Sequence, residues 1–460
     1  MRSTLVLPEA LEREIASAAD LSIESAGVLL AAVAEASNGE KRILARGIRW
    51  VDDSAYDRRD RNGLTIRPEG YIEALAEAER IGAMCIWTHT HPGPDSSPQP
   101  SNHDRYVDDQ IRDLFQLRAG SRFYGALIVS RQGADIAFTG HLEEDGVPAP
   151  IDHLWSVGER FRLSKSFGSA QTYLSSAFDR NVRAFGSAVQ ATLGELRIGI
   201  VGCGGTGSVV AEQLVRLGVR HLTLVDPDLL SESNVTRVYG SALEDVGKPK
   251  VSVLAHHLLR VAPELVCDEV RDMITRESAA RSLVGCDLVF GCTDDNAGRL
   301  VLSRFSSYLL TPVIDCGVLL SSGEKEQLNG IDGRVTVLSP GQACLTCRGR
   351  VDLQRAAAEL LSPDERARRE DEGYAPALAR TEPAVVAFTT FVGSAAVGEM
   401  LERIIGYGPD ARPSELILRI HDREISGNVE SPKPEHYCNS AGGKLGVGIT
   451  DPFLEQTWRT

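Results

Sequence analysis

The stretch LRIGIVGCGGTGSVVAEQLVRLG, residues Leu196 to Gly218, decides the fold of the larger part of this chain. An apolar run predicts a strand, and Gly202, Gly204 and Gly207 follow with the spacing G-x-G-x-x-G at the start of an amphipathic helix. Asp226 ends the next apolar run, at about the distance expected for an acid that binds a ribose. This order predicts a nucleotide whose phosphates lie on backbone N–H groups. The alternative is a turn that only packs the helix on the sheet.

The residues on either side of this motif show two different patterns. From Leu196 onward, strand-like runs alternate with helix-like runs, which predicts an α/β domain built on a parallel sheet. Residues 1–145 carry short apolar runs around two helical stretches, 69–83 and 104–119, which predicts an α+β domain. We therefore expect three segments: a domain at 1–145, a helical connector at 146–185, and a nucleotide-binding domain with a C-terminal extension at 186–460.

Composition excludes several classes of function. The chain has 460 residues, enough for two or three domains, and a formal net charge of -15 with no run of Lys or Arg, which argues against nucleic-acid binding. The N-terminus lacks the apolar core of a signal peptide, and no apolar run is long enough to span a bilayer. We expect a cytoplasmic protein without a membrane partner. Its nine cysteines are then not a disulfide framework.

Polar residues after the second strand separate the possible nucleotide chemistries. Six of them follow Asp226 in this domain: Asp228, Asn234, Arg237, Lys250, Asp294 and Arg299. Hydride transfer does not require this set of charged and polar residues. Attack of a carboxylate on an α-phosphate does, because Arg, Lys and an acid-bound Mg²⁺ stabilise the charge that develops on the phosphoryl oxygens and on pyrophosphate. The set predicts an adenylating enzyme, with an NAD-dependent dehydrogenase as the remote alternative.

These motifs resemble the ThiF/MoeB and ubiquitin-activating (E1-like) superfamily. GCGGTG, DPD, SNVTR, VGKPKV and CTDDNAGR occur in the family's order, between about residues 175 and 405. The resemblance implies a Rossmann-like adenylyltransferase that uses ATP and Mg²⁺ on the C-terminal glycine of a ubiquitin-like or sulfur-carrier protein. The implied ATP-binding residues are Gly202, Gly204, Gly205, Gly207, Asp226, Asp228, Asn234, Arg237, Lys250 and Asp294.

The resemblance also implies roles for individual residues. Asp226 would hold the ribose, and Asn234, Arg237 and Lys250 would contact the phosphates. Asp294 would bind Mg²⁺, so that Arg237, Lys250 and Asp294 would be catalytic. Arg180 would reach the ATP of the partner subunit in a homodimer.

A second motif lies in the N-terminal domain, in CIWTHTHPGPDSSPQPSNHD, residues Cys85 to Asp104. His89 and His91 would point to the same side of an extended chain, which suits two ligands of one Zn²⁺, and Asp104 could be the third. SNHD is equally a good helix start, with Ser101 as the N-cap and an acid three residues later. The residues alone leave both interpretations open.

The order of residues in this domain resembles the JAMM (JAB/MPN-type) metallo-isopeptidases, whose pattern is a glutamate, H-x-H-P and S-x-x-D. SIESAGVLL supplies Glu24, HTHP supplies His89 and His91, and SNHD supplies Ser101 and Asp104. The resemblance implies zinc held by the histidines and Asp104, Glu24 as the general base and Ser101 as the oxyanion contact. Nine residues separate His91 from Ser101 where seven are usual, so His103 or Asp95 are alternatives to Asp104 as the third ligand.

Only Cys344 and Cys347, in CLTC, have the spacing of zinc ligands. In the superfamily such a pair is half of a structural zinc site, and the remaining candidates here are Cys438 and His436, in EHYC. A three- or four-ligand site and a pair of buried thiols without metal both remain open.

The leading hypothesis is a bifunctional enzyme that adenylates a ubiquitin-like protein and also processes or deconjugates it. One alternative is a sulfur-carrier activator in cofactor or cysteine biosynthesis, and another is an adenylyltransferase whose N-terminal domain is a metal-free scaffold. An E2-like conjugating protein is a possible further partner. No cysteine occurs between Arg348 and Tyr437, so we expect that this chain forms no obligatory thioester and that the adenylate passes directly to a thiol on a partner.

Overall fold

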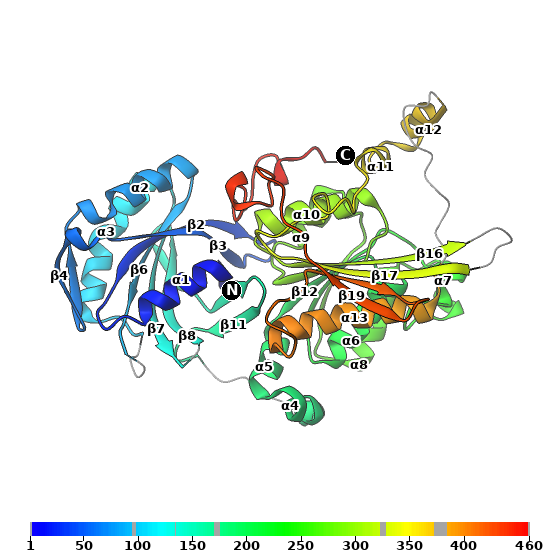
Figure 1. Cartoon of the computed structure of the whole chain (residues 1–460), viewed down its shortest axis with the longest axis horizontal. Helices are drawn as coiled ribbons and strands as arrows, with labels where there is room; N and C mark the ends of the chain where they lie inside the picture. The colour runs from blue at the N-terminus through cyan, green and yellow to red at the C-terminus, as the bar shows by residue number, and fades with distance from the viewer. Residues whose placement is uncertain are drawn as a thin grey trace. The chain divides into compact units, whose positions relative to one another are not determined.

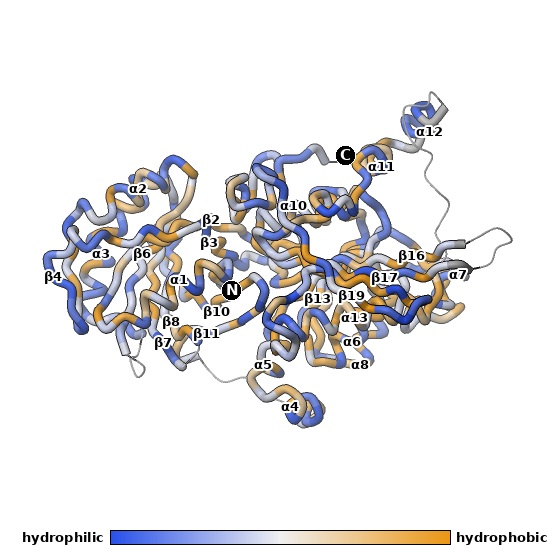
Figure 2. The backbone as a smooth tube through the Cα atoms, in the orientation of Figure 1, coloured by the Kyte–Doolittle hydropathy of each residue, from blue (hydrophilic) through white to orange (hydrophobic). Residues whose placement is uncertain are grey.

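The computed structural model describes residues 2–93, 98–133, 135–169, 175–322, 328–371 and 384–458 (Figure 1). The chain forms two compact units: Met1–Gln171 with Gly446–Ile449, and Thr172–Leu445 with Thr450–Thr460. Figure 2 shows apolar residues concentrated along the strands of both units, whereas α12 is mostly hydrophilic. Among the described residues, no helix is both long and apolar enough to cross a membrane.

The first unit is built on a nine-stranded sheet in the order β11-β10-β1-β3-β2-β6-β7-β8-β9. Its strands are β1 (Ser3–Pro8), β2 (Ala26–Glu35), β3 (Lys41–Trp50), β6 (Met84–Thr90), β7 (Phe123–Gln132), β8 (Asp135–Glu144), β9 (Val147–Pro150), β10 (His153–Val157) and β11 (Phe161–Lys165). A separate hairpin follows the short helix η1 (Asp53–Ala55) and consists of β4 (Tyr56–Asp60) and β5 (Gly63–Ile66).

Helices cover this sheet through two separate apolar clusters. α1 (Glu9–Ala19) contributes Leu11 and Ile15 to one cluster. α2 (Glu69–Ile81) and α3 (Asn102–Ala119) contribute Leu75 and Phe115 to the other. The helices predicted at 69–83 and 104–119 are therefore confirmed.

The helical connector predicted at 146–185 is wrong over its first half, because β9, β10 and β11 occupy residues 147–165. β10 is buried throughout and pairs in parallel with β1, with Leu5 opposite Leu154. This pairing joins residues about 150 positions apart, which a local reading of the sequence does not reveal. Among the residues of this connector that the structure describes, helix begins at η2 (Ser176–Phe178) and continues with α4 (Asp179–Phe185).

The second unit has a mixed eight-stranded sheet in the order β14-β13-β12-β15-β16-β17-β18-β19. The five strands from β14 to β16 run in parallel, as predicted, and the last three are antiparallel. The strands are β12 (Arg197–Val201), β13 (His221–Val225), β14 (Val266–Val270), β15 (Leu288–Gly291), β16 (Val313–Ser322), β17 (Leu328–Leu338), β18 (Glu415–Arg419) and β19 (Glu424–Asn428).

Helices lie on both faces of this second sheet, with α6, α8 and α13 on one face and α9 and α10 on the other (Figure 1). Their bounds are α5 (Ser187–Glu195), α6 (Gly205–Arg216), α7 (Glu232–Val235), α8 (Lys250–Val261), α9 (Glu277–Ser282), α10 (Asn296–Tyr308), α11 (Leu353–Glu359), α12 (Pro363–Asp371) and α13 (Val386–Ile405). Four short 3-10 turns complete the described elements besides η1: η2, η3 (Leu243–Asp245), η4 (Ser440–Gly442) and η5 (Phe453–Glu455). This is the α/β, Rossmann-like arrangement that the glycine motif predicts.

Candidate functional sites

The glycine loop connects β12 to α6 in a turn that only glycine permits at two positions. Gly202 has φ of 91°, and a Cβ on Gly207 would lie 1.8 Å from the carbonyl oxygen of Gly202. At Gly204 a Cβ would meet nothing within 4 Å. The loop is thus closed where it packs on the sheet and open at Gly204, next to the first residue of α6, Gly205.

Asp226 lies at the end of β13 and holds this loop. Its carboxylate accepts hydrogen bonds from the backbone N–H of Cys203 (2.7 Å) and of Asp228 (2.9 Å). Asp226 is only 5% exposed, and burial raises the pKa of its carboxyl. The acid predicted to bind a ribose therefore also ties the glycine loop to the neighbouring strand.

The residues predicted to contact phosphates, Asn234, Arg237 and Lys250, each contact a nearby carboxylate or backbone group. The Nζ atom of Lys250, the first residue of α8, lies 2.7 Å from Oδ2 of Asp228. The side-chain oxygen of Asn234 accepts a hydrogen bond from the N–H of Ser231, and Arg237 donates to the carbonyl of Ser233.

Asp294 follows β15, the strand beside β12, and precedes α10, whose N-cap is Asp295. The register pairs Val201 with both Val225 and Gly291, so the chain leaves three neighbouring parallel strands at one edge of the sheet. The glycine loop, Asp226 and Asp294 all follow that edge. Asp294 is exposed, and no hydrogen bond or ion pair joins it to another residue in the described part of the chain.

Arg180 lies on α4 and is exposed. Its contact with the ATP of a partner subunit stays a prediction.

In the first unit, His89, His91 and Asp104 come together. The Nε2 atom of His89 lies 3.6 Å from Oδ1 of Asp104, and that of His91 lies 3.9 Å from Oδ2. One ligand atom from each of the three residues lies within 4.8 Å of the others. His103 is exposed and outside this trio, and Asp95 lies outside the described residues.

The donors of this cluster fit a metal ion. The Nε2 atom of His89 is buried and has no hydrogen-bond partner among the residues described. Burial lowers the pKa of His89 to about 4, so its imidazole is neutral at pH 7. Two imidazoles and one carboxylate are a ligand set of catalytic zinc sites, which keep a fourth position for water.

Glu24 lies next to this cluster, in the segment before β2. It is 7% exposed, and burial, followed by the charges of Asp104 and Asp60, raises its pKa to about 7. The segment is fixed by Ser25, whose N–H donates to Thr90 Oγ1 and whose carbonyl accepts from the N–H of Thr90, between the two histidines.

Ser101 and Arg59 complete the surroundings of this site. Ser101 is exposed and is the N-cap of α3, where its Oγ accepts from the N–H of Asp104 at 3.1 Å. SNHD is therefore a helix start, as one of the two interpretations predicts, and its Asp104 also lies beside the two histidines. Arg59, which sequence reasoning missed, donates to the carbonyl of Glu24 at 2.8 Å and to Ser25 Oγ at 2.6 Å. No sequence motif marks it.

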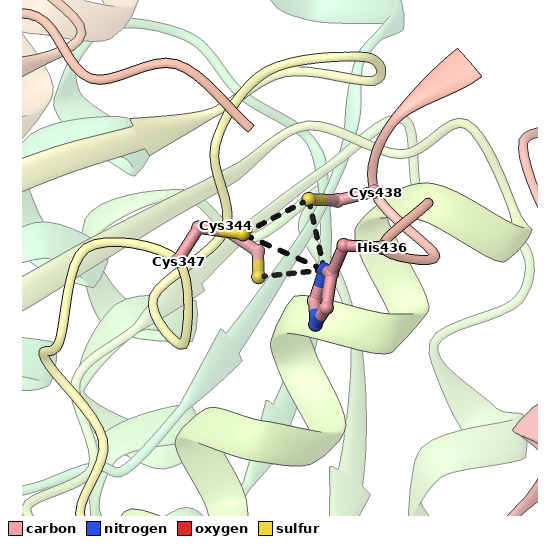
Figure 3. Close-up of side chains that lie close together, drawn as sticks. All are labelled: Cys344, Cys347, His436 and Cys438. Atoms are coloured by element: carbon pink, nitrogen blue, oxygen red, sulfur yellow. Dashed lines mark hydrogen bonds between the residues drawn. The ribbon is translucent and has the colours of Figure 1, made fainter. Parts of the chain in front are cut away.

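A third cluster joins Cys344 and Cys347, which follow β17, to His436 and Cys438, near the C-terminus (Figure 3). The Nδ1 atom of His436 lies 3.7, 3.5 and 3.1 Å from the sulfur atoms of Cys344, Cys347 and Cys438. Three thiols and one imidazole form a set that binds structural zinc. The sequence left a site with His436 open, and the fold brings all four side chains together.

A protein-family model matches most of the second unit. The ThiF family model matches residues 178–440. Molybdopterin-synthase adenylyltransferase of Escherichia coli is 29% identical over 172 residues, 37% of this chain and 65% of the relative. The sulfur carrier protein ThiS adenylyltransferase of the same organism is 29% identical over 160 residues, 34% of this chain and 60% of the relative.

A third relative has another printed activity. It is tRNA threonylcarbamoyladenosine dehydratase 2 of Saccharomyces cerevisiae, 30% identical over 139 residues, 30% of this chain and 31% of the relative. This chain thus spans less than two thirds of the length of each of these three relatives. Because the family model matches more than half of its residues, the chain belongs to the ThiF family.

Proposed function

We propose that this chain is an adenylyltransferase that uses ATP and Mg²⁺ to activate the C-terminal glycine of a ubiquitin-like or sulfur-carrier protein, and that its N-terminal unit is a JAMM-type zinc peptidase acting on the same protein. The observation that carries the bifunctional proposal is the meeting of His89, His91 and Asp104 beside Glu24, in a chain that also belongs to the ThiF family.

The adenylation half is supported by the order of groups along one sheet edge. Backbone N–H groups at the start of α6 suit the phosphates, and Asp226 suits a ribose. Arg237 and Lys250 would stabilise charge on the phosphoryl oxygens, and the exposed carboxylate of Asp294 would hold Mg²⁺. The names of two relatives, both adenylyltransferases, point to the same reaction.

The peptidase half is supported by the chemistry of the N-terminal cluster. His89, His91 and Asp104 would hold zinc, which when bound lowers the pKa of a water ligand. Glu24, with a pKa of about 7, is suited to take a proton and return it near neutral pH. The hydroxyl of Ser101 would donate to the oxyanion of the tetrahedral intermediate.

The fate of the adenylate separates conjugation from sulfur transfer. Because no cysteine occurs between Arg348 and Tyr437, the adenylate would pass to a thiol on a partner, either an E2-like protein or a sulfur donor. Sulfur transfer is the second candidate, favoured by the relative that acts on the sulfur carrier ThiS. The proposal includes a cytoplasmic homodimer in which Arg180 reaches the partner's ATP, and structural zinc at the cluster of Cys344, Cys347, His436 and Cys438.

Two measurements test the proposal. ATP–pyrophosphate exchange with small β-grasp proteins encoded near this gene identifies both the substrate and the reaction. Metal analysis of the purified chain tests the alternative of a metal-free scaffold: zinc that disappears in His89→Ala supports a metallopeptidase, and its absence from the wild-type N-terminal unit supports the scaffold.

A further inference from the structure

Three polar side chains along one face of α3 contact three neighbouring strands. Asp104, Asp108 and Arg112 are spaced by four residues, so they lie on the same side of this 18-residue helix. Asp104 approaches His89 of β6, Asp108 contacts Tyr124 of β7, and Arg112 pairs with Glu143 of β8.

The contact between Asp108 and Tyr124 is direct and partly buried. The Tyr124 side chain is fully buried, and its hydroxyl donates a hydrogen bond to Oδ1 of Asp108 at 2.5 Å. Nε2 of His141, on β8, lies 3.5 Å from the other carboxylate oxygen. Burial, and then the charge of Asp108, raises the pKa of Tyr124 well above its ordinary value. The phenol is therefore a permanent donor at physiological pH.

The third contact fixes the helix one turn farther along. Nε of Arg112 lies 2.8 Å from Oε2 of Glu143, whose side chain is 3% exposed. Contacts at Asp108 and Arg112 thus oppose both sliding and rotation of α3 on the sheet.

Asp104 depends on the position of this helix because it lies in the first turn. Its carboxylate accepts a hydrogen bond from the backbone N–H of Ser101 at 2.7 Å and also faces the two histidines. A shift of α3 would move Asp104 while His89 stays on the buried strand β6. Metal ligands tolerate little displacement, and outer contacts that orient them change metal affinity by about 10- to 100-fold.

We propose that Asp108, held by the hydroxyl of Tyr124, is a positioning residue that sets where Asp104 lies relative to His89 and His91. The inference rests on the proposed zinc site of the N-terminal unit and adds a residue pair that the sequence pattern H-x-H-P with S-x-x-D does not contain.

The test is zinc affinity of the full-length chain, measured by competition with a chromophoric chelator. The step lost in His89→Ala belongs to the N-terminal site, and the step lost in Cys438→Ser belongs to the cysteine–histidine cluster. We expect Tyr124→Phe and Asp108→Ala each to weaken the His89-dependent step about tenfold and to leave the other step unchanged. Asp108→Asn, which keeps an acceptor, should retain most of the affinity. The double variant Tyr124→Phe/Asp108→Ala should lose little more than either single one, because both remove one contact.

Tyr71→Phe is the matched control. The rings of Tyr71 and Tyr124 both pack against Phe115, at 5.4 and 6.0 Å between centroids, but within the described residues the Tyr71 hydroxyl has no hydrogen bond. Tyr71→Phe should bind zinc as the wild type does. Wild-type affinity in both Tyr124→Phe and Asp108→Ala would overturn the inference, as would a loss that affects both zinc steps equally. A wild-type chain with no His89-dependent step would instead refute the proposed zinc site itself, and the two failures are distinguishable for that reason.

Discussion

The Nε2 atom of His89 lies 3.6 Å from Oδ1 of Asp104, although a nine-residue connection rich in Pro and Ser separates His91 from Ser101. His89 is on a buried strand and Asp104 is in the first turn of a helix that packs on the same sheet. The packing of β6 and α3, rather than the length of the connection between them, therefore brings the two side chains together.

This relationship predicts different effects for a ligand and for a general base. His89→Ala should lose the N-terminal zinc, whereas Glu24→Gln should keep it and lose at least about 100-fold in cleavage rate, since Glu24 acts on the proton and not on the metal. Metal analysis and a cleavage assay on the same preparations check both. A Glu24→Gln chain that cleaves at the wild-type rate would show that another residue is the base.

The sheet edge that the glycine loop, Asp226 and Asp294 follow predicts variants of the second unit that lose adenylation alone. Asp294→Ala and Arg237→Ala should each reduce ATP–pyrophosphate exchange by 100-fold or more, because they remove the Mg²⁺ carboxylate and a phosphate contact. Peptide cleavage should be unchanged. Asp268→Ala, an exposed acid on the edge strand β14, is the control and should exchange normally. Loss of both activities in a folded Asp294→Ala chain would contradict two independent sites.

The cysteine–histidine cluster predicts a structural role for metal. Cys438→Ser should lower zinc content by about one ion per chain and lower the melting temperature, because bound zinc stabilises the folded state that forms its site. Addition of a chelator to the wild type should produce a similar shift, measured by differential scanning calorimetry. A Cys438→Ser chain with full zinc content would show that the four side chains form only a thiol cluster.

The sequence predicts contacts between residues that are close along the chain better than contacts between residues that are far apart. The glycine loop and the acids after it are local signals, because their spacing fixes which strand ends they follow. His436 was only an open possibility, since it meets Cys344 across 92 positions of sequence. The strand β10 is hard to predict for a similar reason: Leu154 pairs with Leu5, and no sequence pattern near residue 154 indicates this pairing. Arg59 approaches Glu24 from a hairpin 35 residues away, without a motif.

A buried carboxylate predicts an acid-dependent loss of stability. Burial opposes ionisation of Glu415, but hydrogen bonds from Arg350, Asn428 and Thr336 outweigh it and lower its pKa to about 2. With an unfolded-state pKa of about 4.3, the ionised form contributes about 3 kcal/mol above that pH. The contribution is lost as pH falls from about 4 through 2. Glu415→Gln should therefore lower the free energy of unfolding most near pH 7. Urea titrations should show that the difference in this free energy from the wild type shrinks near pH 3. A constant difference across this range would contradict the assignment.

One measurement tests the central claim that both units act on the same protein. The substrate is a ubiquitin-like protein encoded near this gene, made in two forms: one ends at its glycine, and the other carries a short extension after it. The wild-type chain should support ATP–pyrophosphate exchange with both forms, after a lag for the extended one. Glu24→Gln should support exchange with the mature form alone, because the blocked glycine has no free carboxylate to adenylate. Equal exchange by Glu24→Gln with both forms, or exchange by the wild type only with the mature form, would contradict the account.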